Sequence, residues 1–123
     1  MHGLDVDFGI AGAIIKFENE ESSEFFNFGE IRKDGTFRSG YFSLKCVRLK
    51  IPTKIWQSYY DALVKLIPES KWLPYEQKGI DGKMAWVSDA NGNWPSAVPL
   101  LRNRKQWFKT IEEMIDRIRP FLA

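Results

Sequence analysis

The chain has 123 residues, of which 44% are apolar and 15% aromatic, with a net charge of +2. This length and composition predict one domain with its own core, spanning residues 1–123, and exclude a disordered chain. The single cysteine, Cys46, excludes an intrachain disulfide and favours a reducing, cytoplasmic compartment. No export signal is visible, and no apolar run approaches the roughly 18 residues that span a bilayer, so we expect no membrane association.

Charge is distributed unevenly along the chain. Residues 1–31 contain seven acids and one lysine, a balance of −6, whereas the remainder carries +8. The sequence therefore predicts an acidic N-terminal end on a basic body, and such asymmetry bears on the kind of partner.

The first third of the chain is rich in strand signals. We expect strands at 11–17 and 25–32, the second with Phe26 and Phe28 on one face. The sequence Lys33-Asp34-Gly35 predicts a tight turn, because glycine tolerates a positive φ. From residue 36 to 51 the apolar alternation changes phase twice, which predicts two short strands separated near Gly40.

The middle of the chain predicts a helix from Pro52 to about Pro68. Its apolar residues recur at spacings of three and four, and Thr53 is placed as the N-cap. Proline ends the pattern.

The last 50 or so residues predict short strands and then a second helix. Residues 84–87 form the clearest strand, and 72–78 and 94–101 are weaker because they contain proline. Asp81-Gly82 and Asn91-Gly92 are hairpin signals. A helix follows to about Arg119, with Asn103 and Gln106 as its capping box.

Together these elements predict an α+β fold, a mainly antiparallel sheet of short strands with two amphipathic helices packed on it. A shift of 51 residues superimposes the two helices with matching charge and apolar phase at seven positions. A ββββα duplication would explain this match, and so would chance similarity of two amphipathic helices, so both stay open. By element order, the chain resembles the Whirly-type fold. That resemblance implies single-stranded nucleic-acid binding, and a similar fold recurs among bacterial immunity proteins that block contact-delivered toxins.

Groups for catalysis are scarce in the sequence. The one histidine, His2, is near the terminus, one cysteine and one histidine cannot form a zinc site, and no glycine-rich phosphate loop is present. We therefore expect no enzyme, no catalytic residue, no metal and no cofactor. An alternative is a metal-dependent nuclease, in which Asp5 and Asp7 on one strand share Mg²⁺, but two-metal chemistry needs more converging carboxylates.

The function that the sequence favours is that of a protein-binding module. An acidic stretch followed by aromatic residues suits docking on a basic protein, such as a toxin domain, with apolar anchors inside a charged rim. Trp72 and Trp94 are expected to be a surface pair, whereas Trp56, Trp86 and Trp107 are expected in the core. The predicted partner-binding residues are Glu18, Glu20, Glu21, Glu24, Phe25, Glu30, Trp72 and Trp94.

The alternative is a single-stranded nucleic-acid-binding protein. Cations that follow phosphates, interleaved with aromatic rings such as Phe37 and Tyr41 that stack on bases, are typical of such proteins. The residues for this alternative fall in the basic strands and in an Arg102–Lys109 patch: Arg32, Arg38, Arg48, Arg102, Arg104 and Lys105.

Overall fold

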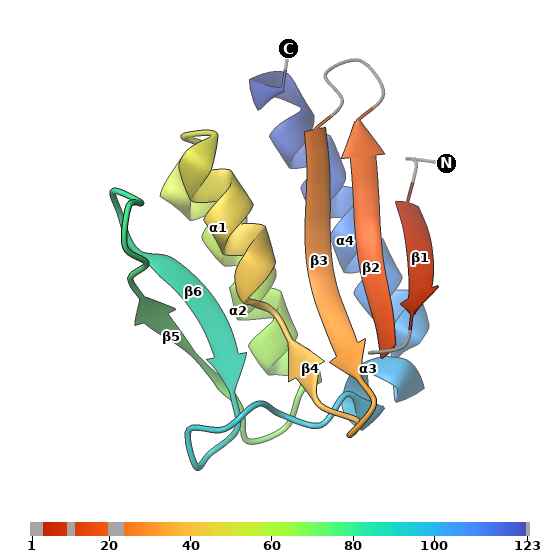
Figure 1. The fold of residues 1–123 in the computed structure, drawn as a ribbon. Coiled ribbons are helices and arrows are strands. Elements are labelled where there is room, and N and C mark those ends of the chain that lie inside the picture. Colours follow the sequence, from red (N-terminus) through yellow and green to blue (C-terminus); the bar gives the residue numbers. More distant parts are fainter. Residues whose placement is uncertain (1–3, 10–11, 20–23, 123) are drawn as a thin grey trace.

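The structure, a computed structural model, describes residues 4–9, 12–19 and 24–122. Four antiparallel strands form the larger of two sheets, paired in chain order (Figure 1). The strands predicted at 11–17 and 25–32 and the turn at Gly35, whose φ is 83°, are confirmed, whereas a first strand, with Asp5 and Asp7, was expected only in the nuclease alternative. The strands are β1 (Leu4–Gly9), β2 (Gly12–Asn19), β3 (Glu24–Arg32) and β4 (Phe37–Arg38).

A β-bulge in β3 decides which side chains reach each face of this sheet. The register shifts opposite Ile15 and Lys16, so one extra residue is accommodated around Phe28 and Gly29. Before the bulge Phe26 and Phe28 are buried, and after it Ile31 points to the same side. Because a bulge changes the phase of the alternation, Glu30 and Arg32 lie on the opposite side. We call this side, which also carries Arg38 opposite Glu30, the outer face.

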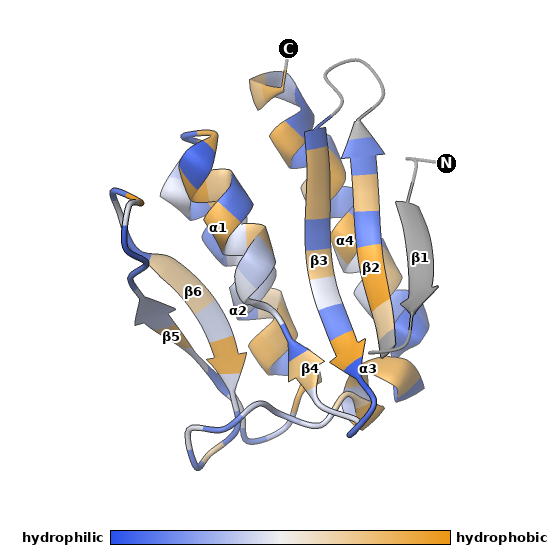
Figure 2. Cartoon of the chain, viewed as in Figure 1, coloured by the Kyte–Doolittle hydropathy of each residue, from blue (hydrophilic) through white to orange (hydrophobic). Residues whose placement is uncertain are grey.

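The inner face packs on two long amphipathic helices, α2 (Thr53–Leu66) and α4 (Arg104–Ile118), both of which confirm the predicted helices. Figure 1 shows α4 behind the sheet, and Figure 2 shows apolar and polar residues alternating along β2 and β3. The helices bury their apolar stripes in one core with the sheet's phenylalanines. No helix in the described part of the chain combines the length and apolar character that crossing a bilayer requires.

The prediction of two short strands between residues 36 and 51 is wrong after Arg38. This segment forms α1 (Gly40–Arg48), which lies between the four-stranded sheet and the smaller sheet (Figure 1). Phe42 and Cys46 are two residues of the apparent strand alternation, but they are also four apart and share one buried helix face. Short apolar segments fit both periods, and tertiary packing selected the helix here.

The smaller sheet is a hairpin of β5 (Lys71–Tyr75) and β6 (Met84–Ser88). Two serines of the α1 region satisfy the other edge of β6: Ser39 Oγ accepts from the Val87 amide at 2.8 Å and Ser43 Oγ from the Ala85 amide at 2.9 Å. Buried backbone donors need such partners. The hairpin is therefore fixed against α1.

The chain after β6 departs from the prediction. Residues 94–101 form no named strand. Only Ser96 makes an isolated bridge, with Thr36, and the short helix α3 (Val98–Arg102) follows. A 3₁₀ turn, η1 (Arg119–Phe121), ends the described chain. The second half therefore shows two strands among the described residues, against four in the expected repeat unit.

Neither predicted helix cap forms. Thr53 is the first helical residue of α2 and Pro52 is the N-cap, so the threonine hydroxyl is one position too late to cap. Asn103 is the N-cap of α4 as predicted, but its side-chain amide donates to the Pro99 carbonyl at 2.9 Å and makes no capping hydrogen bond to α4. The preceding helix α3 offers that carbonyl, and the sequence did not predict α3.

Candidate functional site: a cavity of arginines and tryptophans

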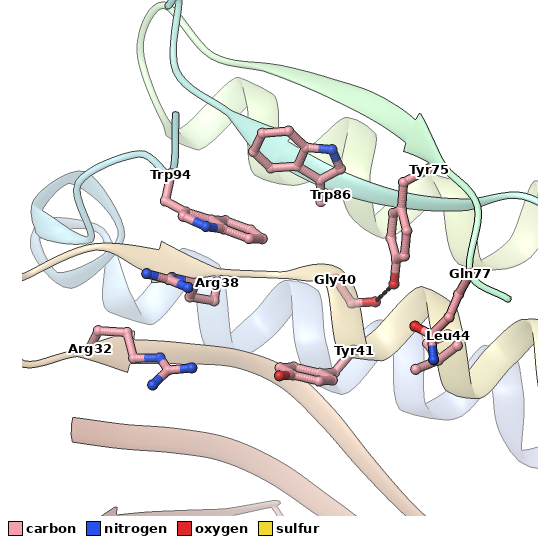
Figure 3. A pocket seen from close by; sticks show the side chains of 9 residues that line it. All are labelled: Arg32, Arg38, Gly40, Tyr41, Leu44, Tyr75, Gln77, Trp86 and Trp94. Atoms are coloured by element: carbon pink, nitrogen blue, oxygen red, sulfur yellow. Dashed lines mark hydrogen bonds between the residues drawn. The ribbon is translucent and has the colours of Figure 1, made fainter. Parts of the chain in front are cut away.

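A cavity of about 300 Å³ opens on the outer face, where β4, α1 and the β5–β6 hairpin meet. Figure 3 shows Trp86 and Trp94 on one side, Arg32 and Tyr41 on the other, and Arg38 beside Trp94. Four of the lining residues are aromatic and two are arginines. The lining residues are Arg32, Arg38, Gly40, Tyr41, Leu44, Tyr75, Gln77, Trp86 and Trp94.

The position of Trp94 is set by a turn after β6. Asp89 Oδ1 accepts from the amides of Asn91 and Asn93 at 2.8 and 2.9 Å, and Gly92 takes a φ of 82°. After the turn, the Pro95 carbonyl accepts from the Phe37 amide of β4 at 2.8 Å. Because both flanks are hydrogen-bonded, the Trp94 ring is held over the cavity. It lies 4.7 Å from the Trp86 ring, centroid to centroid, at 59°.

Arg38 lines this cavity and contains a buried, unsatisfied donor. Its guanidinium lies 4.9 Å from the centroid of the Trp94 ring, a cation–π arrangement. Its Nε atom is buried and makes no hydrogen bond to any residue that the structure describes. An unpaired buried donor costs free energy, and an acceptor would relieve this cost only after a shift of the Arg38 side chain that exposes the Nε atom.

Arg32 is the second cation, and Glu30 partly neutralises it. Its Nε atom lies 3.1 Å from Glu30 Oε1 but is not aligned for a hydrogen bond. The Glu30 side chain is 11% exposed and that of Arg32 35%. The pair therefore anchors Arg32 on the outer face while leaving its tip accessible.

One wall of the cavity is fixed by Tyr75 at the end of β5. Its hydroxyl donates to the Gly40 carbonyl at 2.9 Å, which ties the hairpin to the start of α1 (Figure 3). Burial raises the pKa of Tyr75 above its usual value of 10.0, although hydrogen bonding to Ser43 opposes the shift. The phenol therefore stays protonated near neutral pH and keeps its donor role.

A second, smaller concavity of about 210 Å³ adjoins the cavity along α1. Tyr41 and Leu44 line both hollows, so the two are contiguous. The exposed fractions of Phe25 and Tyr41 are 42% and 49%, unusual for large apolar rings. The residues that line this second concavity are Phe25, Asn27, Tyr41, Leu44, Lys45 and Arg48.

The basic patch predicted near residue 104 forms a separate hollow. Arg102, Arg104 and Lys105 line an open concavity at the start of α4 with Asn103 and Gln106, and all five are exposed. It shares no lining residue with the arginine–tryptophan cavity and has no aromatic lining. The structure thus unites Arg32 and Arg38, places Arg48 in the adjoining concavity and leaves the α4 patch apart.

The predicted acidic–aromatic residues are divided between regions. Glu18 and Phe25 are cross-strand partners at one end of the sheet, near Glu24, whereas Glu30 lies at the other end beside Arg32. Glu20 and Glu21 lie outside the described residues. The predicted surface pair of tryptophans is not formed, because Trp72 packs on the core and donates to Asp61 Oδ1 at 2.9 Å while Trp94 meets Trp86.

The described residues contain no group of three or more acidic, histidine or cysteine side chains that could hold a metal. Asp5 and Asp7 occupy alternate positions of β1, opposite Lys16 and Ile14, but their side chains, like His2, lie outside the description. Cys46 is buried, and burial raises the pKa of its thiol. The cysteine is therefore poorly suited to act as a nucleophile.

Five lining residues were not predicted as site residues from the sequence: Gly40, Leu44, Tyr75, Gln77 and Trp86. Trp86 was expected in the core, but it is only partly buried and lines the cavity, whereas Trp56 and Trp107 are core residues as predicted. The strand alternation could have predicted this position, because Trp86 stands between Ala85 and Val87, which are both fully buried. A period of two places the residue between them on the opposite face.

A scan against protein-family models and searches of curated proteins and of solved structures found no match to this chain.

Proposed function

We propose that the chain binds single-stranded nucleic acid in the arginine–tryptophan cavity. The observation that carries this proposal is Arg38: its guanidinium lies 4.9 Å from the centroid of the Trp94 ring in the lining of the cavity, and its buried Nε atom lacks an acceptor among the described residues. A ligand that satisfies both features brings an anion and a planar ring together. A nucleotide has that composition.

The rings favour a base as the planar part. Stacking on an aromatic side chain stabilises a bound base by about 1–3 kcal/mol and tolerates any sequence. The tilted Trp86–Trp94 pair and the Tyr41 ring line opposite sides of a hollow of about 300 Å³, the lower end of the usual size for ligand pockets. This space suits one base, with its sugar and phosphate at the rim.

The arginines favour a phosphate as the anionic part. A guanidinium presents several donors in one plane and matches phosphate oxygens two at a time. Arg38 and Arg32 lie on the same outer face beside the aromatic side chains. Binding through both features requires an unstacked base, which a single strand offers and a duplex does not.

The test is fluorescence-polarisation binding of labelled oligo-dT and oligo-U at low and moderate salt. If three phosphates are contacted, affinity should fall about 20-fold as salt rises from roughly 50 to 200 mM. The variants Arg38→Gln and Arg104→Gln form a matched pair, with the same charge removed from the cavity and from the α4 patch. The first should weaken binding and the second should not.

Two results would refute the proposal. One is the absence of binding by the wild-type chain at low salt, where phosphate contacts are strongest. The other is equal weakening by both arginine variants, which would indicate diffuse attraction to a basic surface. Lys65→Gln, an exposed site on α2 that lines neither hollow, measures the effect of net charge alone.

Docking on a basic protein is a second proposal, which rests on the far end of the sheet. Phe25 is 42% exposed and stands opposite the exposed Glu18, an apolar anchor beside an acid. Glu18→Lys should then abolish capture of the partner from a lysate, whereas Arg38→Gln should leave it unchanged. Retention of the partner by Glu18→Lys would contradict this proposal.

A further inference from the structure

The seam between β3 and α1 extends the cavity into an elongated groove. Figure 1 shows the two elements side by side, and they run in opposite directions, so Arg32 lies near the start of α1 and Phe25 near its end. Tyr41, Leu44 and Arg48 are spaced at i, i+3 and i+7 and therefore form one face of the helix along this seam.

We infer that the groove is a second subsite, so that the ligand is a strand of two or more nucleotides that continues past Tyr41 to Phe25. This inference rests on the proposed function and extends it. From Tyr41 to Arg48 the helix rises about 10 Å, which adds to the length of the cavity. A mononucleotide would fill the arginine–tryptophan cavity and leave this second region empty.

The second subsite repeats the chemistry of the first. An accessible ring, Phe25, lies beside an exposed cation, Arg48, as Trp94 lies beside Arg38. The ring also carries Lys16, whose Nζ atom is 5.5 Å from its centroid. Aromatic platforms spaced along a basic track are the arrangement on which single strands bind.

The acids near this subsite do not cancel its positive charge. Glu24 is ion-paired with Lys45, which lines the concavity, so that pair is close to neutral. Glu18 opposes the positive charges of Lys16 and Arg48 across the Phe25 ring. Asp5 of β1 also stands opposite Lys16 in the register, so the positive charge of this subsite rests mainly on Arg48 and is weaker than that of a fully basic groove.

The test compares ligand lengths by competition. An unlabelled mononucleotide, dinucleotide, tetranucleotide and octanucleotide of thymidine displace a labelled oligo-dT from the full chain. Affinity should rise from the mononucleotide to the longer ligands. Phe25→Ala and Arg48→Gln should remove at least a fivefold part of that gain, while the affinity for the mononucleotide stays unchanged. Phe121→Ala, a ring of 43% exposure in η1, is the matched control.

The outcomes separate the inference from the proposed function. If the gain with length persists in both groove variants, the second subsite is refuted while binding in the cavity stands. Equal loss of mononucleotide and octanucleotide affinity in Phe25→Ala would also refute it, because the two regions would then not be separate. If no ligand competes and the labelled strand itself does not bind, the proposed function fails.

Discussion

Aromatic residues lie on both faces of the four-stranded sheet, but they have different roles on each face. On the inner face, Phe37 meets Trp107 edge to face at 5.6 Å, and the Trp107 indole donates to Tyr59 Oη at 3.1 Å. That hydroxyl donates in turn to the Phe28 carbonyl at 2.7 Å. On the outer face, Trp94 and Arg38 pair at the mouth of a hollow, and the Arg38 Nε atom has no acceptor among the described residues.

This difference separates groups that stabilise the fold from groups that are available to a ligand. On the inner face the Trp107 indole and the Tyr59 hydroxyl are satisfied within the core, so their net effect is on the free energy of folding, whereas the buried Trp56 Nε1 atom has no partner among the described residues. On the outer face, the aromatic rings of the cavity are partly exposed and the Arg38 Nε atom has no acceptor among the described residues. We therefore expect these groups to contribute to the free energy of ligand binding more than to that of folding. The predictions below test this separation, from the largest expected effect on stability to the smallest.

Replacing Trp107 should have the largest effect. The side chain is fully buried, and Trp107→Ala removes a large ring and leaves the Tyr59 hydroxyl without its donor. We expect a loss of about 3–5 kcal/mol in the free energy of unfolding, measured by urea denaturation followed by circular dichroism. A loss below about 1 kcal/mol would contradict the described packing of the inner face.

Gly29→Ala should lower the free energy of unfolding by about 1–3 kcal/mol, because it overpacks the β-bulge of β3. A Cβ atom at Gly29 would lie only 2.2 Å from Cε1 of the Phe37 ring, so the ring or the strand must move. The same denaturation measurement checks this. Gly35→Ala is the control for backbone strain without a steric contact. A Cβ atom at Gly35 has no atom within 4 Å, but the φ of 83° is unfavourable for alanine. Retention of full stability in Gly29→Ala would contradict the close contact of Phe37.

Trp94→Leu should change stability by less than about 0.5 kcal/mol, as is usual for sites outside the core. Nucleic-acid affinity, by contrast, should fall by about 1–3 kcal/mol, the usual value of one base–aromatic stack. Denaturation and fluorescence polarisation on the same preparation give both numbers. Loss of stability without loss of affinity would show that Trp94 stabilises the fold, and would contradict its assignment to the ligand-binding residues.

The smallest effect concerns the β3–β4 turn beside the cavity. Hydrogen bonds from the side chain and amide of Thr36 lower the pKa of Asp34 below 3.8, against a small opposing desolvation effect, and the charge of Arg38 adds to this. Since the folded pKa is the lower one, the stabilisation is present above pH 3.8 and is lost as pH falls through the folded pKa.

Asp34→Asn keeps an acceptor for Thr36 but removes this titration. Wild type should be slightly more stable than the variant at neutral pH, and the difference should vanish at the acid end. Denaturation curves collected across that pH range measure it. A difference that is independent of pH would contradict the assigned cause of the shift.

The sequence predicted the elements with long, regular patterns. Both long helices and the two central strands follow their apolar periodicity, and that periodicity is the strongest signal in a single sequence. It failed at α1, where Phe42 and Cys46 fit a strand and a helix equally well. The deciding contacts, Ser39 and Ser43 against β6, join residues more than 40 positions apart. No local pattern reports such contacts.

The candidate site was predictable in part. Arg32, Arg38 and Tyr41 were identified from their interleaved basic and aromatic pattern, and the structure gathers them in one cavity. The opposite wall comes from Tyr75, Trp86 and Trp94, which reach the site only because the β5–β6 hairpin folds back against α1. Trp94 was predicted from the sequence, but as part of a protein-docking surface, and Tyr75 and Trp86 were not predicted because they are distant in sequence from the basic strands.

The most direct test of the central claim is an NMR titration of the five tryptophan indole N–H signals with oligo-dT, each assigned by a Trp→Phe variant. The indole signals of the cavity and those of the core can then be followed separately in one experiment. We predict that the signals of Trp86 and Trp94 shift on binding while those of Trp56 and Trp107 stay in place. Unmoved Trp86 and Trp94 signals at saturating oligonucleotide would contradict the claim that the outer-face cavity is the binding site.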